Sequence, residues 1–330
     1  MKKRIFSLFL IIMILTSCSS DSSSRSIFVM DSVAEIKLFS GDGEVTDAIC
    51  DALYELDGIF DAYDGELSRI NENGGGEMSA HLQKIYDLSL EYFEKTDGAF
   101  SPYLGSVVEL WGVGSRNYIP TESEIAEALG ASDAKNFIRD GSVLSLKNGA
   151  RLNLGAIAKG YASDIIREIL ISENVESALI SLGGNIYVHG EKPDGSLWNV
   201  AIRDPRGSEN DWLGSLALSD KFIISSGDYE RYFERDGEKY HHIMDTKTGK
   251  PAESDLVSVS VICENGAMGD ALSTALYTMG KDAALELRRK VGGFELVLVG
   301  RDGVVTITDG LSDIFTPNDI GGYVYETENK

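Results

Sequence analysis

Five short apolar segments lie close together in the second half of the chain, and their connections are the strongest constraint on its fold. They cover residues 178–182, 185–189, 198–203, 222–225 and 256–263, with Gly, Asp and Pro residues between them. Runs of this length, bounded by turn residues, are typical of β-strands. Most of the connections are too short for the helical crossover that parallel strands need. We therefore expect a sheet that is largely antiparallel.

The flanking segments carry helical patterns. Apolar residues recur at helical spacing, which predicts helices at 45–61, 79–95, 121–129 and 156–171 and a helix pair within 267–290. A strand is expected at 27–39 and a hairpin from 294–300 and 303–308. With 43% hydrophobic residues the chain can bury a large core, as one domain or as two fused lobes. These elements predict an α+β fold, a mixed and largely antiparallel sheet core with flanking helices.

The first residues have the pattern of a secretory signal. Lys2, Lys3 and Arg4 precede an apolar run over 5–15, which is too short to span a bilayer. The run ends in Leu-Thr-Ser-Cys18, which resembles a bacterial lipobox. We therefore expect a lipoprotein signal at 1–18, lipidation at Cys18, and a flexible Ser-rich tether at 19–26. The protein would be extracytoplasmic and lipid-anchored, on a periplasmic face or on a cell surface; the alternative is a plain secreted protein in which Cys18 lies near the cleavage site by chance.

Charge and cysteine content exclude several other classes. The chain has 30 basic and 53 acidic residues, a net charge of −23. Such a surface repels nucleic acid and anionic lipid, so no nucleic-acid partner is expected. An anionic ligand would need local donors or a metal ion to bind against this field. Beyond the signal only Cys50 and Cys263 remain, which favours buried free thiols, although one disulfide between them is possible.

Three segments concentrate reactive side chains. Residues 240–251 carry His241 and His242 and then turn sharply. Asp270 and Thr274 are four residues apart in a predicted helix, so both oxygens share one face. Residues 153–161 form a Gly-containing turn into a helix, where backbone N–H groups and Lys159 could meet phosphate. Together an anion site and a metal site suggest phosphoryl chemistry.

Each of these features also has a plain structural explanation. Adjacent strand residues face opposite ways, so at most one of the two histidines should face a site, and we favour His242. Asp270 and Thr274 could cap or pack a helix, and Lys159 alone could be a solvated surface lysine. The pair Gly183-Gly184 lacks dinucleotide-binding spacing and runs into a strand, so a tight turn is expected there, with ligand contact as the second possibility.

Seven motifs, in order, resemble those of the ApbE family of flavin transferases. They lie at residues 30–32, 65–71, 98–102, 110–112, 181–185, 226–229 and 241–242. The resemblance spans Met30 to about Gly280 and implies an ApbE-like (T-fold-like) domain over 27–330. Members of this family move the FMN part of FAD onto a threonine of a target protein through a phosphoester bond, with release of AMP.

The resemblance also implies roles for particular residues. Mg²⁺ would be held by the side chains of Asp270 and Thr274 and the backbone carbonyl of Ala156, an all-oxygen set that suits this ion. His242 would lie near the reacting phosphate and could act as a general base. The residues that match the family's FAD contacts are Met30, Tyr63, Ala99, Phe100, Ser101, Asn153, Lys159 and Met244.

Some positions depart from the family pattern, and two other functions stay open. Asn153 and Ser101 each stand where the family usually has Asp. Tyr63 is the residue usual in transferases, whereas a small polar residue there accompanies FAD pyrophosphatase activity. The alternatives are such a pyrophosphatase, giving FMN and AMP, and a non-catalytic flavin-binding lipoprotein. The expected partner is a flavoprotein with a Ser/Thr-Gly-Ala-Thr acceptor motif, which this chain itself lacks.

Overall fold

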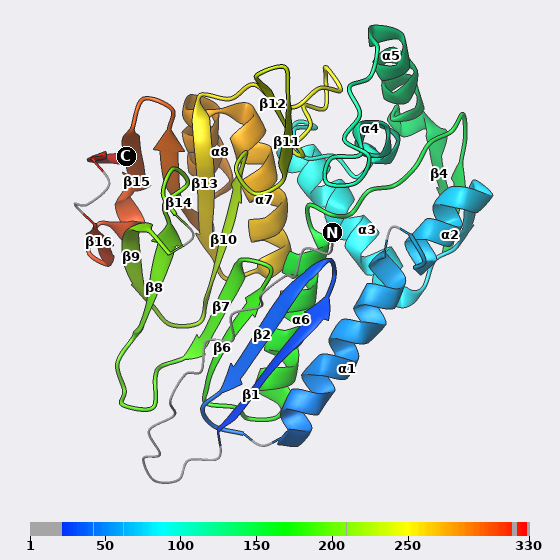
Figure 1. Cartoon of the computed structure of the whole chain (residues 1–330). Coiled ribbons are helices and arrows are strands. Elements are labelled where there is room, and N and C mark those ends of the chain that lie inside the picture. The colour runs from blue at the N-terminus through cyan, green and yellow to red at the C-terminus, as the bar shows by residue number, and fades with distance from the viewer. Residues whose placement is uncertain (1–21, 42, 62, 209, 319–321, 329–330) are drawn as a thin grey trace, which may run out of the picture.

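A mixed nine-stranded sheet organises the protein (Figure 1). The computed structural model describes residues 22–41, 43–61, 63–208, 210–318 and 322–328. Neighbouring strands of the sheet are antiparallel except for the final pair, β15 and β17. The predicted α+β class and the largely antiparallel core are confirmed. In spatial order the strands are β1 (Ser23–Val29), β2 (Ser32–Leu38), β6 (Ser177–Leu182), β7 (Asn185–Gly190), β10 (Lys221–Gly227), β13 (Leu256–Cys263), β14 (Phe294–Gly300), β15 (Val304–Thr308) and β17 (Val324–Glu328).

The N-terminal segment differs from the prediction in two ways. The single strand expected at 27–39 is a hairpin, because Met30 and Asp31 turn the chain with φ values of 53° and 54°. Positive φ at both turn positions matches the twist of paired strands, but Met-Asp carries no sequence signal for such a turn. The predicted tether at 19–26 is also wrong from Ser23 onward, because β1 begins there. Backbone pairing with β2 needs no apolar side chains, so a Ser-rich composition conceals this edge strand.

Helices cover one face of the sheet. The largest buried cluster joins apolar residues of β2, β6, β10, β13 and β14 to those of α1, α3, α6, α7 and α8. Capping residues set several helix starts: Asn265 accepts a hydrogen bond from the Met268 N–H at α7, and Thr121 and Glu124 form a capping box at α5. The helices are α1 (Gly43–Phe60), α2 (Glu66–Asn73), α3 (Ala80–Lys95), α4 (Gly105–Trp111), α5 (Glu122–Ala131), α6 (Ala158–Ser172), α7 (Gly266–Met279) and α8 (Lys281–Val291).

A second, three-stranded sheet covers part of the opposite face. It has the order β16 (Phe315–Pro317), β9 (Trp212–Leu218) and β8 (Trp198–Arg203), and lies at the left of Figure 1. Its apolar side chains form a separate buried cluster with the second face of the large sheet. Because both faces of β13 are covered, all eight of its residues are buried, which explains its continuous apolar sequence.

A smaller region at the upper right of Figure 1 carries α4 and α5. It holds its own apolar cluster, which includes Trp111, Phe233 and Met244. The remaining short elements are β3 (Gly75–Glu77), β4 (Phe137–Asp140), β5 (Val143–Leu146), β11 (Tyr232–Arg235), β12 (Glu238–His241), and the 3₁₀ turns η1 (Ala134–Asn136) and η2 (Asp309–Leu311).

The predicted helices and the later strands are otherwise confirmed within a few residues. Cys50 and Cys263 are buried free thiols, as favoured from the sequence. Among the described residues, no helix is both long and apolar enough to cross a bilayer. The predicted signal and Cys18 lie outside the described residues.

Candidate active site

One cavity of about 730 Å³ collects every predicted site residue other than Cys18. It opens between the large sheet, the N-terminal end of α6, α7 and the segment that follows β12. Residues as far apart in the sequence as Met30 and Thr274, 244 positions (274 minus 30), therefore meet in a single space. The predicted residues that line it are Met30, Tyr63, Ala99, Phe100, Ser101, Asn153, Ala156, Lys159, His242, Met244, Asp270 and Thr274.

A close crossing of α6 and α7 forms the floor of this cavity. Gly160 and Gly266 touch there, because a Cβ on Gly160 would lie 2.2 Å from the Gly266 carbonyl oxygen. The approach lets the Gly160 N–H donate to Asp270 Oδ2 at 2.8 Å. Asp164 of α6 accepts from the Gly266 and Ala267 N–H groups at 2.7 and 2.8 Å and so fixes the first turn of α7. The two helices are held as one unit.

Ala156 offers a further oxygen. It precedes Ile157, the N-cap residue of α6, so its carbonyl lies outside the helix, and among the described residues no hydrogen bond reaches it. The Gly160 N–H belongs to the first turn, where a helix leaves N–H groups without partners, and it donates to Asp270. Thr274 lies one turn beyond Asp270 on α7, with its Oγ1 3.4 Å from Ser226 Oγ. Ala156, just before α6, and Asp270 and Thr274 of α7 thus bring three oxygen donors to the wall of the cavity.

These donors fit a partly hydrated Mg²⁺. The set is all oxygen, contains one buried carboxylate, and leaves room for water and ligand oxygens, which is the coordination that Mg²⁺ favours. The set contains only one carboxylate, and in the part of the chain that the structure describes no group of three or more His, Cys, Asp or Glu residues is arranged to hold a metal ion. The donor chemistry is therefore consistent with the predicted metal site.

His242 faces the cavity directly after β12. Its Nδ1 lies 3.2 Å from the Arg231 carbonyl oxygen, which can only accept, so Nδ1 carries the proton. Nε2 then holds a lone pair. The surrounding walls desolvate the ring and lower the pKa of His242 to about 4. At neutral pH this imidazole is an uncharged base.

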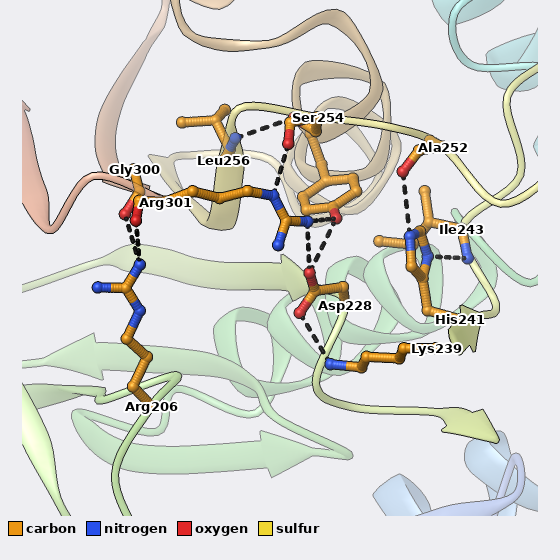
Figure 2. Close-up of polar contacts among 11 residues, drawn as sticks. Arg206, Asp228, Lys239, His241, Ile243, Ala252, Ser254, Leu256, Gly300 and Arg301 are labelled. Carbon is orange, nitrogen blue, oxygen red and sulfur yellow. Dashed lines mark hydrogen bonds and ion pairs between the residues drawn. The ribbon is translucent and has the colours of Figure 1, made fainter. Parts of the chain in front are cut away.

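His241 has a structural role, as the strand alternation predicts. It is buried, and its Nε2–H donates to the Ala252 carbonyl at 3.1 Å, while its Nδ1 accepts from the Ile243 N–H at 3.3 Å (Figure 2). Its ring also packs edge-on against Tyr277 of α7. Both ring nitrogens are used, so this histidine ties the His242 segment to the protein core.

An ion cluster around the buried Asp228 anchors the same segment from the other side (Figure 2). Asp228 follows β10 and accepts from Lys239 Nζ at 3.1 Å, from Arg301 Nη2 at 2.6 Å and from the Tyr277 hydroxyl at 3.3 Å. Burial opposes ionisation, but these donors outweigh it and hold the pKa of Asp228 below its usual value. The cluster joins α7 to the loop whose Arg231 carbonyl orients His242.

The flavin-binding residues predicted from the resemblance form another part of the wall. The Met30 N–H donates to Asp57 Oδ1 at 2.9 Å, which fixes the turn between β1 and β2. Phe100 is buried, whereas the Tyr63 side chain is 73% exposed at the rim. The Asn153 side chain accepts from the Gly155 N–H at 3.1 Å and stiffens the turn before Ala156. Trp111 donates to the Gly249 carbonyl at 2.8 Å, a structural role outside the site.

Several lining residues were not predicted as site residues. Asn185, Arg203, Glu230 and Arg231 all line the cavity. Glu230 is in contact with solvent, but the cavity walls around it desolvate its carboxyl group. This desolvation raises the pKa of Glu230 to about 7. Asn185 ends a motif that resembles the family's, which was a signal for a site, but the motif alone assigned it no role. Glu230 and the two arginines lie in loops or at a strand end and carried no spacing signal.

Comparison with known proteins agrees with this geometry. The family model described as "ApbE family" matches residues 30–298. The chain belongs to the ApbE family. One curated ApbE relative, the FAD:protein FMN transferase of Treponema pallidum, is 35% identical over 270 residues, covering 76% of this chain and 75% of the relative. The FAD:protein FMN transferase of Klebsiella pneumoniae is 28% identical over 312 residues, covering 92% and 97%.

Solved ApbE structures share the fold over nearly the whole chain. The crystal structure of the ApbE protein of Thermotoga maritima has a TM-score of 0.81 at 30% identity, covering 89% of this chain and 99% of that one. The apo form of the flavinyl transferase ApbE of Pseudomonas stutzeri has a TM-score of 0.79 at 29% identity, covering 90% and 98%. The ApbE-like fold expected from the sequence is confirmed.

Proposed function

We propose that this member of the ApbE family transfers FMN from FAD to a threonine hydroxyl of a target flavoprotein, with Mg²⁺ bound at Asp270, Thr274 and Ala156. The FAD:protein FMN transferase activity itself follows from its relatives. The metal ion, the threonine acceptor and the residue roles are the finer part of the proposal. One observation carries them: a neutral imidazole with a free Nε2 lines the same cavity as three oxygen donors suited to Mg²⁺.

The chain's own residues can perform the transfer without redox change in the flavin. His242 Nε2 accepts the proton of the threonine hydroxyl as its Oγ attacks the phosphorus of the FMN half. A new P–O bond forms, the bond from that phosphorus to the bridging oxygen breaks, and AMP leaves with that oxygen. Lys159 lines the same cavity and would balance developing negative charge. The positive charge that Mg²⁺ supplies when bound would compensate the diphosphate of FAD.

Positioning accounts for much of this chemistry. The Arg231 carbonyl fixes the tautomer of His242, and the Gly160–Gly266 crossing fixes Asp270 relative to Ala156. Groups held in advance avoid the entropy loss of assembling them at the moment of reaction. The exposed Tyr63 at the rim is consistent with a site that must admit a protein acceptor.

We also propose that the protein is extracytoplasmic and anchored to a bacterial membrane by a lipid at Cys18, on a periplasmic face or on the cell surface. The sequence of residues 1–18 supports this. Replacing Cys18 with Ala should move the protein from the membrane fraction to the soluble fraction. Retention of the Cys18→Ala protein in washed membranes would contradict the anchor.

The transfer is tested by intact-mass spectrometry of an acceptor flavoprotein bearing Ser/Thr-Gly-Ala-Thr. The protein lacking residues 1–18 is incubated with FAD, Mg²⁺ and this acceptor. We expect a mass gain of one FMN residue, which is lost when the acceptor threonine is replaced with Val. An unmodified acceptor with accumulating FMN and AMP would identify a pyrophosphatase, and unchanged FAD would identify a flavin-binding protein.

A further inference from the structure

The nine-stranded sheet has a gap between the neighbouring strands β7 and β10, beside the candidate active site. Along β10, residues 222–227 pair with β13, whereas only Lys221–Ile223 pair with β7 on the other edge. The chain turns away at Gly183 and Gly184, so β7 begins at Asn185. Among the described residues, no strand pairs with that edge over 224–227. Alternate residues there direct their N–H and C=O groups toward the gap.

The gap lies inside the active-site cavity. Ile223 packs in the cluster under the small sheet, whereas Ser226 bonds to Ser273 of α7 on the helix face at 2.8 Å. Both residues line the cavity, together with Ser225. A single cavity can touch both faces of a sheet only where the sheet is open. The four-residue edge offers a slot of about 13 Å.

Asn185 supplies an independent sign of a ligand. It lines the cavity and is 4% exposed, yet its Nδ2 has no hydrogen-bond partner within the described part of the chain. A buried amide without a partner is unfavourable and rare in native proteins. An amide both donates and accepts, so a peptide group is its natural complement. A Cβ on Gly184 would meet nothing within 4 Å, which leaves the turn open to a ligand.

The C-terminal end of the slot adjoins both parts of the reaction centre. Ser226, near that end, has its Oγ 3.4 Å from Thr274 Oγ1, one of the expected metal ligands. From the same end β10 leads within four residues to Arg231, whose carbonyl oxygen orients His242. A hydroxyl carried at this end of a segment in the slot would arrive near the metal ligands and the base.

We propose that an extended segment of the acceptor protein binds as a short added strand on residues 224–227 of β10, with the Asn185 amide paired to its backbone. This inference rests on the proposed transferase function and names the docking place of its protein substrate. Strand addition satisfies a row of main-chain groups at once, whatever the side chains of the partner. The remainder of the opening is lined by Arg203, Glu230 and Arg231, which would contact the flanks of the acceptor.

Hydrogen–deuterium exchange tests the slot directly on the unsubstituted protein. Full-length protein in mild detergent is compared alone, with FAD and Mg²⁺, and with the acceptor flavoprotein carrying Ser/Thr-Gly-Ala-Thr. We expect the acceptor to slow amide exchange within 224–227 at least fivefold, while FAD alone does not. Protection by FAD alone would show that the flavin occupies the slot and would overturn the proposal, as would no protection by a bound acceptor.

Asn185→Leu tests the amide. We expect the acceptor KM to rise at least tenfold, with the FAD dissociation constant unchanged. Ser177→Ala is the matched control, because Ser177 Oγ is also buried without a partner but does not line the cavity. An equal loss of FAD affinity, or an unchanged acceptor KM, would refute the assignment. Absence of FMN transfer by the unsubstituted protein would refute the transferase function. The hydrogen–deuterium exchange data test binding of the acceptor in the slot independently of transfer.

Discussion

Replacing Gly160 with Ala tests whether the helix crossing builds the metal site. A Cβ there would lie 2.2 Å from the Gly266 carbonyl oxygen and 2.6 Å from Asp270 Cβ. To reach an ordinary contact of 3.4 Å the helices would have to part by about 1.2 Å (3.4 minus 2.2). This movement would separate the Asp270 carboxylate from the Gly160 N–H and from the Ala156 carbonyl.

The size of the effect can be estimated from its components. Overpacking of this kind costs about 1–3 kcal/mol. Loss of the hydrogen bond from Gly160 to the Asp270 carboxylate costs about 1.5–3 kcal/mol. The higher helix propensity of Ala offsets up to about 1 kcal/mol of this loss in stability. We expect a net loss of roughly 1.5–6 kcal/mol, or about 3–12 °C in melting temperature at about 2 °C per kcal/mol for a chain of this size.

The assay pairs calorimetry with a Mg²⁺ titration of FMN transfer. Gly160→Ala should require at least tenfold more Mg²⁺ for half-maximal rate, because the oxygen donors are displaced relative to one another. Gly130→Ala in α5 is the matched control: a Cβ there meets nothing within 4 Å, so it should leave the Mg²⁺ requirement unchanged. An unchanged melting temperature and Mg²⁺ requirement in Gly160→Ala would refute the role of the crossing.

Further substitutions test the other groups of the site. Asp270→Ala should abolish Mg²⁺-dependent turnover while far-UV circular dichroism stays unchanged, and full activity would remove the metal assignment. In a Glu230→Gln background, kcat/KM should stay level from pH 8 to pH 5, because burial lowers the pKa of His242 to about 4; a fall centred near pH 6.5 would contradict a buried base. Asp228→Asn should lower the free energy of unfolding in urea by about 3 kcal/mol at pH 7. The pKa of Asp228 is held below its usual value by Arg301 and Lys239 against the effect of burial, so this difference should shrink as pH falls below about 4 and should not depend on pH near neutrality. Tyr63→Asn should shift products from labelled acceptor to free FMN, measured by chromatography, and an unchanged product ratio would show that Tyr63 does not control the acceptor.

Local signals in the sequence predicted most of the secondary structure. Short apolar runs with short connections indicated antiparallel strands, and helical spacing located α1, α3, α5, α6 and the α7–α8 pair. The turn at Met30 and Asp31 was missed because Met is not a turn former and Asp31 is not followed by Gly, although both residues adopt positive φ. The sequence did not predict the strand β1, because its pairing depends on backbone groups rather than on side chains.

Motif resemblance predicted which residues line the candidate site. It could not predict how these residues are arranged in space. The Asp270–Thr274 spacing placed two oxygens on one helix face, as observed. The position of Asp270 against the first turn of α6 depends on a hydrogen bond from Gly160 to this residue, 110 positions away, which no local pattern encodes. The unpaired amide of Asn185 is likewise visible only when the whole sheet is assembled.

Two features that depend on glycine residues shape this candidate site. At Gly160 and Gly266 the absence of side chains brings α6 against α7, so that the Gly160 N–H donates to the Asp270 carboxylate. At Gly184 the early turn into β7 leaves one edge of β10 without a neighbouring strand over four residues. Among the described residues the Ala156 carbonyl receives no hydrogen bond, and the open edge of β10 lacks ladder hydrogen bonds. Bound ligands can satisfy both, a cation at the free oxygens and a peptide at the open edge, so binding energy would be gained where the chemistry takes place.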